Sequence, residues 1–79
     1  GLFEQIIEII ENETEEPLEM KKISLDDNLF DDLHLDSLNT IVIVNEIEEK
    51  FTITLNTDEL ANIKTVRDIE EMVKTYLEK

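Results

Sequence analysis

Near the start of the chain, apolar residues recur at the three- and four-residue spacing of an α-helix. Residues 2–12 carry glutamates on one side and, on the other, an apolar stripe of Phe3, Ile6, Ile7 and Ile10. Leu2 and Ile9 lie at the edges of this stripe. Isoleucine is β-branched and has a low helix propensity, so tertiary packing must supply most of the stability. The pattern predicts an amphipathic helix whose stripe faces the core.

Residues 38–51 give two conflicting signals. Four consecutive β-branched residues at positions 41–44 favour a strand. The polar residues that follow do not alternate, however, and helical spacing connects Leu38, Ile41, Val44, Ile47 and Phe51. We therefore interpret this segment as a helix, with Ile41, Val44, Ile47 and Phe51 in the core.

Two more helical segments are predicted towards the C-terminus. The alternating Thr-Ile-Thr-Leu run that ends at Leu55 has no partner strand, so we expect an extended connection with Leu55 in the core. Thr57 is a candidate N-cap for a short segment, 58–62. Thr65 and Asp68 resemble a capping box at the start of a longer helix. The apolar positions of that helix are Val66, Ile69, Met72 or Val73, and Tyr76 or Leu77.

Residues 13–35 contain the chain's only proline, Pro17, and show no clean period. A structureless stretch of this length argues against a compact domain unless apolar side chains pin it to the core. Ser24, or the polar run 26–28, can build turns between such anchors. The candidate anchors are Ile23, Leu25, Leu29, Phe30 and Leu33.

The length of 79 residues allows a single domain, 1–79, which is too small for a deep active-site cleft. The formal net charge is −14, so no basic patch can be assembled to neutralise nucleic-acid phosphates. We expect a basic protein surface as partner, although acidity for solubility alone is the alternative. The predicted core consists of Ile6, Ile10, Phe30, Ile41, Val44, Ile47, Phe51, Ile63, Ile69 and Val73.

Cysteine is absent, which excludes a disulfide framework and a thiolate metal site and fits a reducing compartment. No secretory signal and no long apolar run are present, so the expectation is a cytoplasmic monomer that does not insert into membranes.

The tripeptide Asp36-Ser37-Leu38 is the candidate for chemistry. Asp36 is a good N-cap, since its carboxylate can accept hydrogen bonds from the first turn of the following helix. Ser37 then stands in that turn with its hydroxyl in solvent. A phosphate esterified to Ser37 would lie at the positive end of the helix dipole, where an anion is tolerated. An ordinary capped helix needs the same residues.

Two other kinds of site fit the same region poorly. His34, Asp36 and Ser37 are too close in sequence to reach the geometry of a catalytic triad, and no nucleophile elbow is present. Asp31, Asp32 and Asp36 could attract a divalent cation only weakly, because the spacing and glycine of an EF-hand are absent. We predict neither catalytic residues nor a metal site.

Residues 32–41, DLHLDSLNTI, resemble the phosphopantetheine attachment motif of acyl carrier proteins. That motif usually reads Asp-Leu-Gly-x-Asp-Ser-Leu, followed by Asp or Asn, a small residue and an aliphatic one. The similarity continues through residues 46–51, 58–59 and 63–66 and into the last helix, so it covers nearly the whole chain.

The resemblance implies an all-α, four-helix acyl-carrier-like bundle, with three longer helices, one short helix and a long loop between the first two. It implies a carrier and not an enzyme. A phosphopantetheinyl transferase would attach 4'-phosphopantetheine to Ser37, flanked by Asp36 and Leu38. The other implied partners are acyl- or aminoacyl-loading enzymes and synthases with basic or mixed docking patches. In such carriers the core can also open to shelter an acyl chain.

The sequence departs from the family pattern at several positions. His34 replaces the usual glycine, and because histidine takes a positive φ only occasionally, we expect the loop to turn differently. His34 could contact the phosphate, but an exposed loop histidine without a role is the favoured interpretation. Asn39 and Val42 replace two acids of the family's docking helix. The expected partner face therefore consists of Asn39, Val42, Glu46 and Glu49.

These departures leave the cargo open. An acyl carrier for fatty-acid, polyketide or related specialised biosynthesis is the first interpretation, with somewhat more weight on a specialised role. An aminoacyl, D-alanyl or peptidyl carrier that serves an adenylating ligase is the first alternative. The second is an acidic helical interaction module that is never modified, in which Ser37 is only part of a helix cap.

Overall fold

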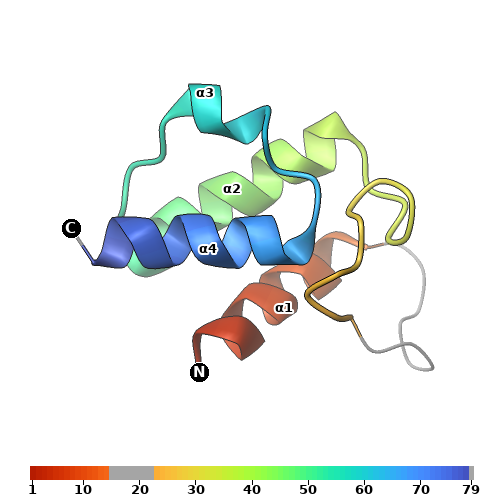
Figure 1. Ribbon diagram of the computed structural model, residues 1–79, viewed down its shortest axis with the longest axis horizontal. Helices are drawn as coiled ribbons and strands as arrows, with labels where there is room; N and C mark the ends of the chain where they lie inside the picture. Colours follow the sequence, from red (N-terminus) through yellow and green to blue (C-terminus); the bar gives the residue numbers. More distant parts are fainter. Residues whose placement is uncertain (15–22, 79) are drawn as a thin grey trace.

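The computed structural model describes residues 1–14 and 23–78. Within these ranges it contains three longer helices, α1 (Leu2–Glu13), α2 (Ser37–Phe51) and α4 (Val66–Leu77), and the short helix α3 (Thr57–Leu60). α1 packs against both α2 and α4, and α3 lies at one edge of the bundle (Figure 1). The described residues form no strand, only an isolated bridge between Asn28 and Thr65. The predicted all-α architecture is therefore confirmed, while Pro17 lies outside the described residues.

The core lies between α1, α2 and α4 and is closed by apolar residues of the loops. In α1 the buried residues are Ile6, Ile9 and Ile10, whereas Phe3 and Ile7 are half-buried. The stripe is thus rotated slightly towards Ile9, which the spacing had placed at its edge. The predicted core residues Val44, Ile47, Ile63, Ile69 and Val73 are buried as well.

The predicted face of α2 is correct at Val44 and Ile47 and wrong at Ile41. Leu38 and Ile41 are 69% and 48% exposed, and the buried residues are Thr40, Ile43, Val44 and Ile47. The reason is that apolar residues fill positions 41–44, so a helical stripe can be drawn through Ile41 or through Ile43. Packing against α1 selects the second stripe, and Phe51 at its end is half-buried against the core. Thr40 is tolerated inside because its hydroxyl donates to the Asp36 carbonyl at 3.0 Å.

The loop before α2 is built from turns that side chains close. The Asn28 Oδ1 atom accepts hydrogen bonds from the N–H groups of Phe30 and Asp31 at 2.8 and 2.9 Å. This turn directs Leu29 into the core, where it is fully buried, and leaves the neighbouring Phe30 39% exposed. The prediction that Phe30 is a core anchor is therefore wrong. Ile23 and Leu33 are buried as predicted, and Leu25 is half-buried against the core.

Backbone hydrogen bonds fasten this loop to the start of α4. The N–H groups of Val66 and Arg67 donate to the carbonyls of Asp27 and Leu25 at 3.1 and 2.9 Å. In the opposite direction, the N–H of Leu29 donates to the Lys64 carbonyl at 2.8 Å. The loop thus supplies acceptors that a helix N-terminus otherwise lacks. This explains how an aperiodic stretch is held in place.

The segment between α2 and α4 corrects one predicted cap. Asn56, and not Thr57, caps α3, since its Oδ1 atom accepts from the Asp58 N–H at 2.9 Å, and the helix ends at Leu60. Leu55 is buried as predicted. The capping box at the start of α4 is confirmed, with Thr65 and Asp68 each accepting the other's backbone N–H.

None of the helices in the described part of the chain is long and apolar enough to span a bilayer.

Candidate functional site

The start of α2 is fixed by a reciprocal pair of hydrogen bonds. The Asp36 carboxylate accepts from the Asn39 N–H at 2.8 Å, and the Asn39 side chain accepts from the Asp36 N–H at 3.1 Å. Asp36 has extended backbone angles and ends the loop, so Ser37 becomes the first residue of the helix. The prediction that Asp36 caps this helix is confirmed, and Ser37 is exposed.

The first two N–H groups of α2 remain open. In the described part of the chain, no group accepts a hydrogen bond from the backbone N–H of Ser37 or Leu38. Both N–H groups lie at the positive end of the helix dipole. An anion attached at Ser37 would therefore meet unengaged donors.

His34 turns the chain just before this helix. Its φ is 58°, in the left-handed region that glycine favours, and the next residue but one, Asp36, is already the cap. The N–H of Leu35 donates to the Leu29 carbonyl at 2.9 Å and holds the turn closed. The expectation that histidine makes the loop turn differently is not supported, because His34 accepts the conformation at a strain of about 1–3 kcal/mol.

A groove with mostly apolar walls opens beside Ser37. Its volume is about 360 Å³, and it runs from α2 to α3 and to the segment before α4. The exposed side chains of Phe30 and Ile41, which sequence analysis had assigned to the core, form part of its wall. Periodicity could not reveal this groove, since its members come from different parts of the chain. The lining residues are Phe30, Ser37, Thr40, Ile41, Leu60, Ala61, Ile63 and Lys64.

The four residues predicted for the partner face differ in their burial and in their contacts. Asn39 is half-buried, and its side chain is occupied by Asp36 and by Glu13, to which its amide donates at 3.5 Å. Val42 is half-buried. Glu46 and Glu49 lie together at a cavity between α1 and α2 that Lys50 also lines. The side chains that are exposed next to Ser37 are instead apolar: Leu38 and Ile41.

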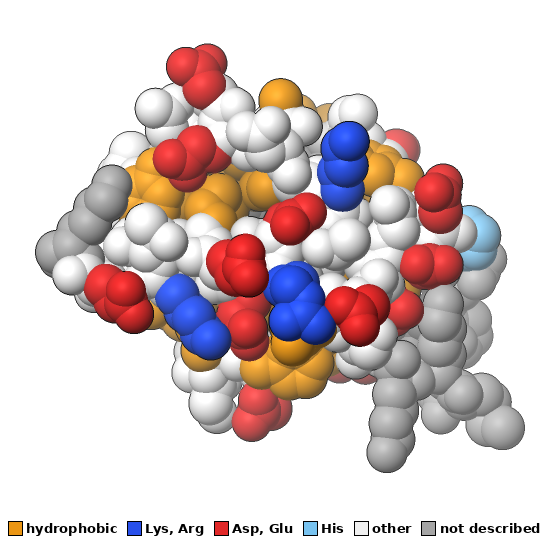
Figure 2. Space-filling view, in the orientation of Figure 1, with side chains coloured by type: hydrophobic (Ala, Val, Ile, Leu, Met, Phe, Trp, Pro, Cys, Tyr) orange, Lys and Arg blue, Asp and Glu red, His pale blue; other side chains and the backbone are white. Residues whose placement is uncertain are grey.

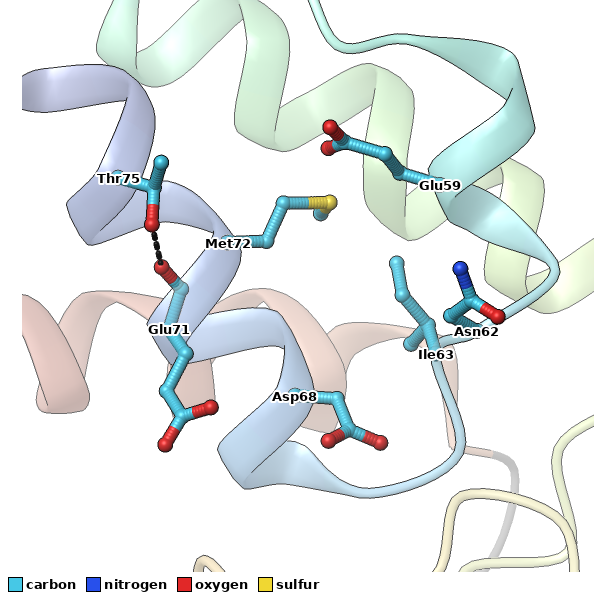
Figure 3. A pocket seen from close by; sticks show the side chains of 7 residues that line it. All are labelled: Glu59, Asn62, Ile63, Asp68, Glu71, Met72 and Thr75. Atoms are coloured by element: carbon cyan, nitrogen blue, oxygen red, sulfur yellow. Dashed lines mark hydrogen bonds between the residues drawn. The ribbon is translucent and has the colours of Figure 1, made fainter. Parts of the chain in front are cut away.

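A further cavity, of about 270 Å³, lies between α3 and α4 (Figure 3). Met72 reaches into it from α4, and Ile63 forms part of its wall. The carboxylates of Glu59, Asp68 and Glu71 point in different directions (Figure 3). Among the described residues, no cluster of three or more acidic, histidine or cysteine side chains is arranged to hold a metal ion.

Asp68 serves the start of α4. Partial burial acts to raise the pKa of Asp68, but the hydrogen bonds that its carboxylate receives, from the N–H groups of Lys64 and Thr65 and from the Thr65 hydroxyl, act against it. The positive charge of Lys64 acts in the same direction as these hydrogen bonds, and the pKa of Asp68 is lowered overall. Asp68 is therefore a structural carboxylate, held ionised by the helix that it caps.

Comparison with known proteins places the chain in a family. A family model described as the phosphopantetheine attachment site matches residues 4–73. The acyl carrier protein of Exiguobacterium sibiricum is 38% identical over 76 residues, which are 94% of this chain and 96% of the relative. The chain belongs to the acyl carrier protein family.

Further relatives and solved structures agree with this assignment. The acyl carrier protein of Onion yellows phytoplasma is 40% identical over 68 residues, covering 86% of this chain and 87% of the relative. A structure described as an acyl carrier protein from Mycobacterium tuberculosis superimposes with a TM-score of 0.87 at 29% identity, over 96% of this chain and 99% of that one. An acyl carrier protein from Thermotoga maritima shares the fold, with a TM-score of 0.76 at 23% identity over 98% and 92% of the two chains.

Membership of the acyl carrier protein family gives the general function of the chain. Acyl carrier proteins are carriers and not enzymes, they bear phosphopantetheine, and they interact with transferases and synthases. Among the described residues, no hydrogen bond joins the side chains of His34, Asp36 and Ser37. The Asp36 carboxylate is bound to the Asn39 N–H instead.

Proposed function

We propose that Ser37 is the phosphopantetheine attachment residue, and that the protein carries acyl groups as an acyl carrier protein of fatty-acid, polyketide or related specialised biosynthesis. The observation that carries this proposal is the exposed hydroxyl of Ser37 in the first turn of α2, inside the segment that matches the attachment-site family. When bound, the phosphopantetheine arm supplies the thiol that holds acyl groups as thioesters.

The residues around Ser37 fit a phosphate ester. The unengaged N–H groups of Ser37 and Leu38 and the helix dipole favour an anion at this point, although the protein as a whole is strongly acidic. Asp36 keeps its carboxylate turned to the Asn39 N–H at 2.8 Å, so it stabilises the turn. The groove beside Ser37 offers apolar walls to the part of the arm beyond the phosphate.

Attachment uses coenzyme A as the donor and a transferase as the catalyst. The Ser37 Oγ atom forms a bond to the phosphorus that carries the pantetheine group. The bond from that phosphorus to the 3',5'-bisphosphate of adenosine breaks, and the serine proton passes to solvent. Ser37 is thus an acceptor that is modified once, and the reactions of the cargo belong to the partner enzymes.

The partner face that we propose surrounds Ser37 on α2. Leu38 and Ile41 supply exposed apolar contacts, Val42 contributes a partly exposed one, and Glu46 and Glu49 supply negative charge further along the helix. Apolar contacts at the centre with charges at the rim suit a docking patch that is basic or mixed. Asn39 contributes mainly by fixing the cap, because its side chain is bound to Asp36 and Glu13.

Intact mass spectrometry tests the attachment site. The protein is incubated with coenzyme A and a promiscuous phosphopantetheinyl transferase, and we expect a mass increment of one phosphopantetheine. Ser37→Ala should lose the increment completely. Ser24→Ala is the matched control, since Ser24 is the only other serine and is also exposed, and it should be modified normally. An unmodified wild-type protein with an active transferase would favour an acidic interaction module instead.

The loading reaction then separates the kinds of cargo. An aminoacyl, D-alanyl or peptidyl carrier would be charged by an adenylating ligase, whereas the proposed acyl carrier is charged by an acyltransferase or acyl ligase. Asn39 and Val42 stand where the family's fatty-acid members usually have acids, which supports a specialised pathway. If the cargo is an acyl group, the modified protein should accept a short acyl group in an acyltransferase assay and give no thioester with amino-acid-specific ligases. A thioester formed by such a ligase would favour the aminoacyl carrier instead.

A further inference from the structure

Lys64 lies beside the candidate attachment site and has no ion-pair partner among the described residues. The structure describes the surroundings of Lys50, Lys64, Arg67 and Lys74. Arg67 pairs with Asp26 at 2.9 Å, and Lys74 pairs with Glu70 at 3.4 Å. Within the described residues the ammonium of Lys64 forms no ion pair, and Lys64 lines the same groove as Ser37.

The groove of Ser37 and Lys64 also differs in charge from the other cavities. The cavity between α3 and α4 is lined by Glu59, Asp68 and Glu71, and Figure 2 shows acidic side chains spread over the face on which α4 lies. No carboxylate is among the described residues that line the groove beside Ser37. The net charge of the chain is −14, yet an anion that entered this groove would find Lys64 and no carboxylate among the described residues of the wall.

Lys64 has an electrostatic interaction with Asp68, since its positive charge helps to lower the pKa of Asp68. The Asp68 carboxylate, however, accepts hydrogen bonds from the backbone N–H groups of Lys64 and Thr65 at 2.9 and 3.0 Å, so it is held at the start of α4. The Lys64 side chain is exposed and flexible, and its ammonium carries three rotatable donors. The cation therefore remains available to a second anion.

We propose that Lys64 is a positioning residue for the arm: its ammonium pairs with the phosphodiester on Ser37, so that the arm lies along the apolar groove instead of extending into solvent. The inference rests on the proposed function, since it needs the arm on Ser37. Phe30, Ile41 and Leu60 would then contact the arm beyond the phosphate. An ion pair of this kind weakens with salt, so ionic strength would shift the balance between the docked and the extended arm.

A spin-labelled arm tests this proposal directly. A nitroxide-bearing coenzyme A analogue is transferred to Ser37, and the paramagnetic relaxation enhancement of the Ile41, Leu60 and Ile63 methyl groups is measured against the reduced label. The variants are Lys64→Gln, Lys64→Arg and, as a control, Lys74→Gln, which removes a lysine that already has a partner. The substitutions at Lys64 leave its backbone hydrogen bonds intact, and an amide spectrum verifies the fold.

The expected result is a two- to fivefold weaker enhancement in Lys64→Gln than in the wild type at low salt, roughly the range that an exposed ion pair supplies. Lys64→Arg should restore the wild-type value and Lys74→Gln should keep it, while molar salt should bring the wild type down to Lys64→Gln. Equal enhancement in the wild type and Lys64→Gln at low salt would overturn the role of Lys64 and leave the carrier function intact. Failure of the label to attach to wild-type Ser37 would overturn both.

Discussion

Two helices of this carrier begin with the same kind of capping box, yet their N-termini are in different states. At α4 the Thr65 hydroxyl accepts from the Asp68 N–H, and loop carbonyls accept from the N–H groups of Val66 and Arg67. At α2 the Asp36 carboxylate accepts from the Asn39 N–H, and the two N–H groups before it have no acceptor in the described ranges.

The difference lies in the loop that precedes α2. Residues 25–29 pass beside the start of α4 and saturate its donors, so that this helix end is closed to ligands. The same loop then presents Ser37 at the end that remains open. A capping box therefore fixes where a helix starts, and tertiary contacts decide whether that start is structural or available for binding.

The largest expected effect comes from the residue that holds the loop on α4. Leu29→Ala should lower the free energy of unfolding by about 2–5 kcal/mol, because Leu29 is fully buried and leaves a cavity. The matched control is Leu38→Ala at the open helix end, where the exposed side chain should change stability by less than about 0.5 kcal/mol. Chemical denaturation measures both. Equal losses would mean that the two helix ends are equally packed.

Removal of either cap should lower the free energy of unfolding by a similar amount, but the two substitutions should change the exchange of different amides. Thr65→Ala and Asp36→Ala should each lower stability by about 1 kcal/mol, since each removes the acceptor of one N–H. In Thr65→Ala the amides of Val66 and Arg67 should stay protected by the loop carbonyls. In Asp36→Ala the whole first turn of α2 should exchange freely. Native-state hydrogen exchange measures this difference. Equal loss of protection in the first turn of α4 in Thr65→Ala and in the first turn of α2 in Asp36→Ala would contradict the comparison.

The third prediction concerns the charge at the closed end. Asp68→Asn keeps an oxygen acceptor but removes the charge. It should lower the free energy of unfolding by about 1 kcal/mol at neutral pH, because hydrogen bonds to a charged acceptor are stronger. The folded-state pKa of Asp68 is depressed below its ordinary value of 3.8. The stabilisation is therefore complete above the unfolded pKa and is lost as the pH falls through the folded pKa.

The pH dependence is read from the difference between two proteins. Protonation of the many other acids relieves repulsion in the wild type and in Asp68→Asn alike, so only the gap between their unfolding free energies reports on Asp68. This gap should be constant from neutral pH to about pH 5 and shrink below the ordinary value of 3.8. A gap that widens on acidification would show that the carboxylate is not favoured by the fold.

The smallest effect is expected for the ion pair that bridges the loop and α4. Arg67 and Asp26 are 2.9 Å apart, and the Asp26 carboxylate acts first by its hydrogen bond and then by its charge to raise the pKa of Arg67. The Arg67 side chain is about half exposed and the Asp26 side chain is largely exposed, so Arg67→Gln should leave thermal unfolding nearly unchanged, and any change should vanish in high salt. A large loss of stability would show that this pair, and not the backbone hydrogen bonds, closes the helix end.

Much of the candidate site could be predicted from short-range features. The N-cap role of Asp36, the exposure of Ser37 and the Thr65–Asp68 box each depend on groups within a few residues of one another. The surroundings of Ser37 could not be predicted in this way. Phe30 and Ile41 were expected in the core and instead form part of the groove wall, together with Lys64, which the sequence did not single out.

The sequence by itself determined the three longer helices, their starting points, the strong negative charge and the position of the serine. These follow from hydrogen bonds and spacings within one or two helical turns. Only the tertiary structure decided which face of α2 is buried, since four consecutive apolar residues permit two stripes and the packing against α1 selects one. It also decided that the loop closes α4 and leaves α2 open, because those acceptors come from residues far away in the chain.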